Sequence, residues 1–245
     1  FGVGWAPGGG SPLFDKARQA GIPENLLMDA GLVRRRDDGG CYDFFYNRIM
    51  IPIRDAKGRT VGFGARALDD LGGKSKGPKY VNTPETPLFH KGRLIYGYDL
   101  AMPAIRKEKR VILVEGYTDV MAAHQEGHRT VCAVLGTATT SDHAALIRRS
   151  GARRATLVFD GDEAGARATR KALMGLLPLE IDIDVAAPPP GEDPCDLLVR
   201  DGGKPFQKLV DQPVGWLEFL LGRMQDLDPK QLSEAVNELL EVLFV

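Results

Sequence analysis

The chain has 245 residues, of which 43% are hydrophobic and 27% charged, and its formal net charge is −1. This composition is typical of a globular protein with a substantial core and excludes an intrinsically disordered chain. No apolar run approaches the roughly 18 to 20 residues of a membrane span and no signal-like leader is present, so we expect a cytoplasmic protein without a membrane partner.

The first hundred residues are predicted to mix helices and strands. Helical spacing occurs at residues 11–20 and 23–30, each followed by a glycine. Residues 48–54 and 60–67 flank a turn and predict a β-hairpin, and the segment 72–77 predicts a mobile loop. This half is basic, because residues 44–110 hold 14 lysines and arginines against 6 aspartates and glutamates. We interpret the basic run at its end, residues 106–110, as a solvated linker.

From residue 111 onward, short branched apolar segments alternate with amphipathic ones, which is typical of a parallel sheet covered by helices on both faces. Four strands are predicted at residues 111–114, 131–135, 155–159 and 181–186. Three helices are predicted at residues 117–126, 142–149 and 163–177. Ser141 is the expected N-cap of the second helix. Residues 111–200 are acidic, with 13 aspartates and glutamates against 9 lysines and arginines.

The last part of the chain is predicted to be helical, with helices at residues 205–210, 214–224 and 229–244. We therefore expect a basic α+β N-terminal subdomain, a central α/β subdomain with a Rossmann-like, mostly parallel sheet, and a helical C-terminal subdomain. Their predicted bounds are residues 1–108, 109–203 and 204–245. Because the sequence opens on Phe1 and closes within a helical pattern, we expect a fragment whose last subdomain is truncated.

Acidic residues follow three of the predicted strands. Glu115 follows the first strand, with Asp119 one helical turn later, Asp160 and Asp162 follow the third, and Asp193 follows the fourth. Ligands of open α/β sheets bind beyond the carboxyl ends of the strands. Carboxylates gathered there repel one another unless a cation neutralises them, and Mg²⁺ prefers such hard oxygen ligands. The pattern predicts a metal-dependent phosphoryl-transfer site, with Glu115 as a metal ligand or base.

Two of these segments resemble the motifs of the Toprim superfamily, which includes primases, topoisomerases and nucleases. Residues 111–119, VILVEGYTD, are similar to its first motif, and residues 159–165, FDGDEAG, to its second. Residues 135–140, LGTATT, resemble the connecting segment of DnaG-type primases. The resemblance implies a Toprim fold for the central subdomain.

The basic half resembles the same branch of the superfamily. Residues 48–66 and 78–92 are similar to successive DnaG motifs, and residues 1–7, FGVGWAP, to an earlier one. The likeness implies the RNA polymerase domain of a bacterial primase, which synthesises short RNA primers on single-stranded DNA by metal-assisted nucleotidyl transfer. It also implies ribonucleoside triphosphates as substrates, Mg²⁺ or Mn²⁺ as cofactor, and a replicative helicase and a zinc-binding domain as partners of the full-length protein.

The resemblance assigns roles to particular residues. It implies metal roles for Glu115, Asp160, Asp162 and Asp193, with Asp119 in support. It implies nucleotide or template contacts for Arg48, Arg66, Lys79, Tyr80, Asn82 and Lys91, and a part in catalysis for Lys79 and Lys91. The family commonly has aspartate where Cys195 stands in GEDPC, residues 191–195, and the following Asp196 is a candidate substitute.

Two other functions also fit parts of the sequence. A haloacid-dehalogenase-like phosphatase places Asp-x-Asp after a strand and uses the first aspartate as nucleophile. A non-catalytic Toprim DNA-binding repair module keeps the fold with incomplete or structural carboxylates. The phosphatase leaves the Glu115-Gly116 pair and the basic half unexplained, and the repair module leaves the complete acidic set unexplained.

Overall fold

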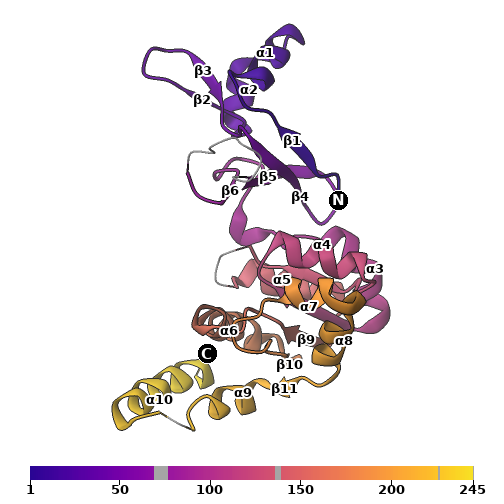
Figure 1. Ribbon diagram of the computed structural model, residues 1–245, viewed down its shortest axis with the longest axis vertical. Helices are drawn as coiled ribbons and strands as arrows, with labels where there is room; N and C mark the ends of the chain where they lie inside the picture. The colour runs from indigo at the N-terminus through magenta and orange to yellow at the C-terminus, as the bar shows by residue number, and fades with distance from the viewer. Residues whose placement is uncertain (69–76, 136–138, 226, 245) are drawn as a thin grey trace. The chain divides into compact units, whose positions relative to one another are not determined.

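The computed structural model describes residues 1–68, 77–135, 139–225 and 227–244 (Figure 1). They form two compact units, Phe1–Lys91 and Gly92–Val245, and both mix helices with strands, which confirms the predicted fold class. The predicted loop at 72–77 lies, apart from Gly77, outside the described residues, as does the middle of the LGTATT segment. The division into three subdomains stays a prediction.

The first unit is built on an antiparallel sheet in the order β1-β4-β5-β6. Its strands are β1 (Gly4–Ala6), β4 (Arg48–Arg54), β5 (Thr60–Ala67) and β6 (Tyr80–Asn82). Strands β4 and β5 form the predicted hairpin, with Ile51 opposite Gly64. The Asp55 carboxylate shapes its turn by accepting hydrogen bonds from the backbone N–H groups of Lys57 and Arg59.

A second, two-stranded sheet and two helices complete the first unit. The helices are α1 (Pro12–Gln19) and α2 (Glu24–Asp29), and the strands are β2 (Val33–Arg35) and β3 (Cys41–Asp43). The buried Asp43 carboxylate on β3 accepts hydrogen bonds from the backbone N–H groups of Leu13 (2.8 Å) and Phe14 (2.9 Å). The first turn of α1 is thus capped by a residue distant in sequence, and Ser11 makes no such side-chain bond.

The second unit contains a five-stranded sheet in the order β11-β10-β9-β7-β8. Its strands are β7 (Arg110–Val114), β8 (Val131–Ala133), β9 (Arg154–Leu157), β10 (Asp182–Val185) and β11 (Val214–Gly215). The four predicted strands are present and run parallel, and β11 adds an antiparallel edge. Every residue of β8, and all of β7 after Arg110, is buried, which explains their uniformly apolar sequence.

Helices cover both faces of this sheet. They are α3 (Tyr98–Glu108), α4 (Tyr117–Gln125), α5 (Ser141–Ser150), α6 (Glu163–Leu176), α7 (Pro194–Val199), α8 (Lys204–Asp211), α9 (Trp216–Gly222) and α10 (Pro229–Leu243). Helix α4 packs against α7, whereas α5 packs against α3 and α6. Because right-handed crossovers lead from β7 outward to β8 and from β9 outward to β10, α4 and α6 lie on opposite faces. The sheet therefore has a topological switch point between β7 and β9.

Three predictions for this unit are wrong in detail. The run 106–110 is solvated at residues 106–109 but is not a linker, because it spans the end of α3 and the start of β7. The half-buried Arg110 donates hydrogen bonds to Thr156 Oγ1 (3.0 Å) and the Val210 carbonyl (2.6 Å). The N-cap of α5 is Thr140 rather than Ser141, since the Thr140 hydroxyl accepts a hydrogen bond from the backbone N–H of His143. Val214–Gly215 pairs with β10 instead of starting a helix.

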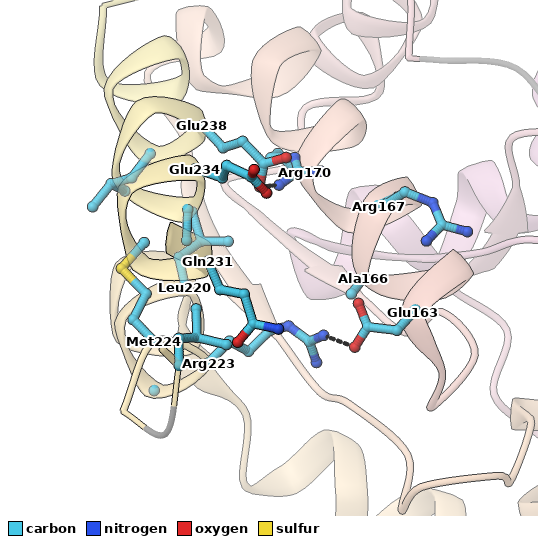
Figure 2. A pocket seen from close by; sticks show the side chains of 14 residues that line it. Glu163, Ala166, Arg167, Arg170, Leu220, Arg223, Met224, Gln231, Glu234 and Glu238 are labelled. Atoms are coloured by element: carbon cyan, nitrogen blue, oxygen red, sulfur yellow. Dashed lines mark hydrogen bonds and ion pairs between the residues drawn. The ribbon is translucent and has the colours of Figure 1, made fainter. Parts of the chain in front are cut away.

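Helix α9 packs against β10 and β11, and helix α10 packs against α6. The side chain of Arg223 pairs with Glu163, and Arg170 pairs with Glu238 (Figure 2). Leu220 and Val242 are the only buried apolar residues among the described residues of these two helices. In the part of the chain that the structure describes, no helix is both long and apolar enough to span a bilayer.

Candidate active site at the strand ends

The predicted carboxylates surround the switch point of the sheet. Glu115 directly follows β7, and Asp160 and Asp162 lie in the connection from β9 to α6. The backbone N–H of Asp160 donates a hydrogen bond of 3.4 Å to Glu115 Oε1, so the ends of these neighbouring strands are in direct contact. The structure thus brings Glu115 to the same edge as the two aspartates.

A backbone clasp adds the segment after β10 to this edge. The N–H of Gly161 donates to the carbonyl of Glu192 (3.0 Å), and the N–H of Gly191 donates to the carbonyl of Gly161 (3.3 Å). A Cβ on Gly161 would lie 2.3 Å from the Pro189 carbonyl oxygen, so only glycine permits this approach. The clasp places Asp193, the next residue along, beside the Asp160–Asp162 segment.

The electrostatics of the cluster show that these carboxylates are close together. Burial raises the pKa of Asp160, and the negative charges of Asp193 and Asp162 raise it further. Burial and the charge of Asp160 likewise raise the pKa of Glu115. The charge of Asp196 also acts on Asp160, so the residue after Cys195 lies within electrostatic range of the cluster. Such mutual repulsion favours a bound cation.

Two of the carboxylates also start helices. Asp162 is the N-cap of α6 and accepts a hydrogen bond from the N–H of Gly165 (2.8 Å). Asp193 is the N-cap of α7 and accepts one from the N–H of Asp196 (2.8 Å). In both residues only Oδ1 serves the cap, which leaves Oδ2 available to another partner. The caps fix the direction of both side chains before any ligand binds.

The chemistry of this donor set fits a hard divalent cation, although the side chains do not converge on one point. Within the described residues, no three His, Cys, Asp or Glu side chains are placed to hold one metal ion together. Mg²⁺ usually takes only one or two protein carboxylates and completes its shell with waters and substrate phosphates. The edge therefore fits an ion that shares its ligands with a substrate better than a closed structural metal site.

Within the cluster, the pKa of Asp119 is shifted most strongly. Its side chain is 6% exposed and accepts a hydrogen bond from the N–H of Gly116 (2.9 Å). Burial, followed by the charges of Asp160, Asp193 and Glu115, raises the pKa of Asp119 from 3.8 to about 7. Between these two pH values the folded state holds a proton that the unfolded state releases.

We expect this proton to make stability depend on pH. Since the folded state binds more protons, the free energy of unfolding falls as the pH rises from about 4 to about 7, by at most about 4 kcal/mol from Asp119. Asn in place of Asp119 keeps an acceptor for Gly116 and cannot ionise, so Asp119→Asn should reduce this fall. Urea unfolding at pH 5 and pH 8 without divalent cations measures it, and an unchanged difference between the two pH values would contradict the prediction.

In the first unit, three of the predicted contact residues share one face of the sheet. Arg66 on β5 lies opposite Tyr80 on β6, with its guanidinium 5.9 Å from the ring centre, and Asn82 lies two residues further along β6. Arg66 Nε is buried without a hydrogen-bond partner. A buried donor of this kind is costly unless a ligand satisfies it, and a phosphate oxygen is a suitable acceptor.

Arg48 lies on the other face of this sheet, because it is paired with Ala67 and not with the Arg66 position. Its buried guanidinium donates to the carbonyls of Pro78 (2.9 Å) and Lys79 (3.4 Å). It thereby holds the backbone leading into β6. The structure does not bring Arg48 together with Arg66, Tyr80 and Asn82.

The two predicted lysines are accessible to solvent. Lys79 is exposed, immediately before β6. Lys91 is partly exposed in a short 3-10 helix, Lys91–Arg93, and its backbone N–H donates to Glu85 Oε1 (3.0 Å). Neither ammonium group is paired with an acidic side chain in the described ranges, so both are available to an anion.

Gly165 was not among the predicted site residues, although it lies in the FDGDEAG motif. A Cβ on Gly165 would lie 2.0 Å from the carbonyl oxygen of Asp160. The first turn of α6 therefore rests directly on the backbone of a candidate metal ligand. The sequence signal was the glycine three residues after Asp162, at the first turn of a helix where glycine is otherwise unfavourable.

Comparisons with known proteins agree with this architecture. The model of the DNA primase catalytic core, N-terminal domain, matches residues 1–102, and that of the Toprim domain matches residues 109–187. The DNA primase of Deinococcus radiodurans is 44% identical over 200 residues, which cover 81% of this chain and 34% of that protein. The DNA primase of Escherichia coli is 39% identical over 229 residues, covering 91% and 38% respectively. The chain thus spans little more than a third of these relatives.

Solved structures match over most of the chain. The RNA polymerase domain of Mycobacterium tuberculosis primase DnaG is 37% identical with a TM-score of 0.85, covering 98% of this chain and 80% of that one. A DnaG primase catalytic domain bound to single-stranded DNA is 38% identical with a TM-score of 0.79, covering 91% and 69%.

The strand order of the second unit, its acidic edge and the domain match define a Toprim-class protein. The preceding basic unit matches the N-terminal domain of the DNA primase catalytic core. The chain belongs to the family of bacterial DnaG primase catalytic cores.

Proposed function

We propose that this chain is the polymerising part of a primase, which joins ribonucleotides into short RNA primers on single-stranded DNA. The observation that carries the proposal is the group of carboxylates at the switch point, where Glu115 contacts the Asp160 backbone and the clasp at Gly161 adds Asp193. Like-charged side chains held this close favour a divalent cation and its phosphate ligands.

In the proposed reaction, the 3′-oxygen of one ribonucleotide attacks the α-phosphorus of the next, and the bond to the β-phosphate breaks with release of pyrophosphate. Asp160, Asp162 and Asp193 would hold Mg²⁺ or Mn²⁺, with Asp119 in support and Asp196 replacing the carboxylate that Cys195 lacks. A bound ion would neutralise charge on the triphosphate and on the leaving group. Glu115, whose pKa is raised, accepts the proton of the attacking hydroxyl.

The first unit would supply contacts to nucleotides and template. Arg66 with its unsatisfied Nε, together with Lys79 and Lys91, binds phosphate oxygens, and the exposed Tyr80 ring stacks on a base beside Asn82. Arg48 contributes indirectly, because its guanidinium holds the backbone on which Lys79 and Tyr80 are carried. Lys79 and Lys91 assist catalysis by neutralising phosphate charge.

We infer the partners from the relatives. The similar DnaG domain with bound single-stranded DNA supports a DNA template here. A helicase and a zinc-binding domain would be met through parts of the full-length protein, of which this chain corresponds to about a third. The protein would act at the replication fork, in the cytoplasm.

Extension of a short RNA annealed to single-stranded DNA tests the function without requiring initiation. With labelled ribonucleotides, we expect products in Mg²⁺ or Mn²⁺ and none after chelation. Release of phosphate from a small phosphomonoester through an aspartyl intermediate would instead indicate a phosphatase. DNA binding without either activity would indicate a non-catalytic Toprim module. Such a module would not need the full set of acidic residues that this chain has.

We expect template binding to weaken steeply with salt, since it rests on phosphate contacts. Lys79→Ala should weaken binding of single-stranded DNA regardless of sequence and lower the slope of log affinity against log salt by about 0.7, the value of one phosphate contact. Fluorescence anisotropy at several salt concentrations measures the slope. Lys57→Ala, at the exposed hairpin turn of the same unit, is the matched control, and equal slopes for the two variants would contradict the assignment of Lys79.

A further inference from the structure

Helix α6 divides its basic side chains between two directions. Arg170 pairs with Glu238 on α10, whereas Arg167 points away from α10 in Figure 2. Lys171 follows Arg167 by one helical turn, so the two side chains lie on the same side of the helix. Both are exposed, and neither makes an ion pair with any residue that the structure describes. The acidic helix α10 thus neutralises Arg170 on one side of α6, whereas Arg167 and Lys171 on the other side stay without an acidic partner among the described residues.

These two side chains line a small cavity that begins at the candidate active site. The cavity has a volume of about 170 Å³ and lies between α6 and the ends of β7 and β9. Glu115 lines it together with Arg167, Lys171 and Thr139, and the remaining wall is apolar, including Val134 and Phe159. An anion in this cavity would therefore lie beside the acidic edge and against two cations.

A second, wider cavity adjoins the first. It measures about 560 Å³ and lies between α5 and α6, and it shares Thr139 and Lys171 with the smaller one. Arg148 on α5 adds a third exposed cation, and Ser141 adds a hydroxyl. We refer to Arg148, Arg167 and Lys171 as the α5–α6 basic cluster. Like the other two, the Arg148 side chain has no acidic partner among the described residues.

The backbone of α6 packs closely against the segment before α5, which fixes the wall of the two cavities. A Cβ on Gly175 would lie 2.4 Å from the Thr139 carbonyl oxygen, so the backbone of α6 touches the segment that leads into α5. Thr139 itself is buried, and the adjoining Thr140 caps α5. The cations consequently project from helices whose separation is fixed, and a multivalent anion would meet a preformed arrangement of donors.

We propose that the α5–α6 basic cluster binds the phosphate groups of pyrophosphate and draws it away from the strand-end carboxylates after nucleotidyl transfer. The inference rests on the proposed function, because that reaction breaks the bond between the α- and β-phosphates and releases the β- and γ-phosphates as pyrophosphate. Guanidinium and ammonium groups are the usual side-chain partners of phosphate oxygens. Their placement next to the acidic edge gives the leaving anion a path of favourable charge.

The size of the inner cavity and the lining of both cavities favour a small polyphosphate over a nucleic acid strand. The inner cavity is smaller than the roughly 300 Å³ at which pockets for larger ligands begin. Binding of single strands also depends on exposed aromatic rings for base stacking. Among the described residues, the only aromatic one that lines either cavity is Phe159, which is 6% exposed. The described lining thus offers charged partners to phosphates and no exposed aromatic ring to bases.

Equilibrium binding of pyrophosphate to the intact chain tests the proposal. Calorimetric titration with EDTA present excludes metal-mediated binding, and we expect Arg167→Gln/Lys171→Gln to raise the Kd at least about tenfold. Lys208→Gln/Lys230→Gln removes the same charge from exposed lysines outside both cavities and should change the Kd less than about twofold. Thermal unfolding of each variant verifies that the exposed substitutions leave the fold intact.

A parallel titration with short single-stranded DNA distinguishes the two sources of phosphate. Loss of DNA affinity with unchanged pyrophosphate affinity in Arg167→Gln/Lys171→Gln would overturn the proposal in favour of a strand-binding surface. Equal pyrophosphate affinity in both double variants would also overturn it. Binding requires no turnover, so an inactive chain that shows the expected loss would contradict the primase function, and with it the role after nucleotidyl transfer, but not the binding of pyrophosphate by the cluster. An active chain without that loss would contradict this inference alone.

Discussion

Asp160→Asn is expected to reduce RNA extension by roughly 10²- to 10³-fold while leaving the fold at least as stable as the wild type. The loss follows because the amide cannot supply the negative charge that holds a divalent cation. The stability follows because burial and neighbouring aspartates raise the pKa of Asp160, so its ionised form is unfavourable in the folded state without metal. If the acidic cluster serves to bind a cation, replacing one of its carboxylates should lower activity without lowering stability.

The measurements are the rate of primer extension in Mg²⁺ and the free energy of unfolding in urea with EDTA. Asp182→Asn is the matched control, because Asp182 is exposed on β10 of the same unit and has only a loose ion pair, 3.7 Å from Arg154. Its extension rate should stay within about twofold of wild type. Comparable extension by Asp160→Asn would refute the metal role, and a large loss of stability would show that Asp160 is structural.

Gly165→Ala is expected to lower the free energy of unfolding by roughly 3 kcal/mol or more and to abolish most of the extension activity. The added Cβ would lie 2.0 Å from the Asp160 carbonyl oxygen. The oxygen belongs to the backbone and the Cβ is fixed directly to it, so neither atom can move aside by a change of rotamer. Either α6 shifts or the Asp160–Asp162 segment is displaced. Urea unfolding and primer extension together measure the two consequences.

Gly222→Ala provides the control for this change. Gly222 also lies in a helix, α9, and a Cβ there meets nothing within 4 Å. We expect it to be neutral or to stabilise by about 0.4 to 1 kcal/mol, because alanine restricts the unfolded chain. If Gly165→Ala unfolded like Gly222→Ala, the close contact between α6 and Asp160 would be incorrect.

The acidic edge could be predicted because its signals are local. The β7 strand is a run of branched apolar residues ending in Glu115-Gly116, and the parallel arrangement dictates that Glu115 and Asp160 meet at one edge. The hairpin of β4 and β5 was likewise evident from its turn at Asp55. In these cases, short stretches of sequence contain both the element and its boundary.

The remaining features depend on residues far apart in the chain. The guanidinium of Arg48 binds the carbonyls of Pro78 and Lys79, 30 and 31 residues away, and its nucleotide or template contact stays a prediction. Helix α3 was not predicted, since it contains Pro103 and starts after Gly97 without a side-chain cap. The two residues of β11 become a strand only because β10 offers a free edge. No local pattern encodes such partners.

Asp162 and Asp193 each cap a helix and also belong to the candidate cation site, so binding of an ion can be followed at the two helix caps. Each carboxylate shares its charge between a helix start and the candidate cation site, so a bound ion competes electrostatically with the amide protons of Gly165 and Asp196. Those two amides are therefore built-in reporters of the site. Because a bound ion draws electron density from the two carboxylates, these amides should exchange with deuterium faster when the ion is bound. The exchange rate would therefore report ion binding without any nucleotide present.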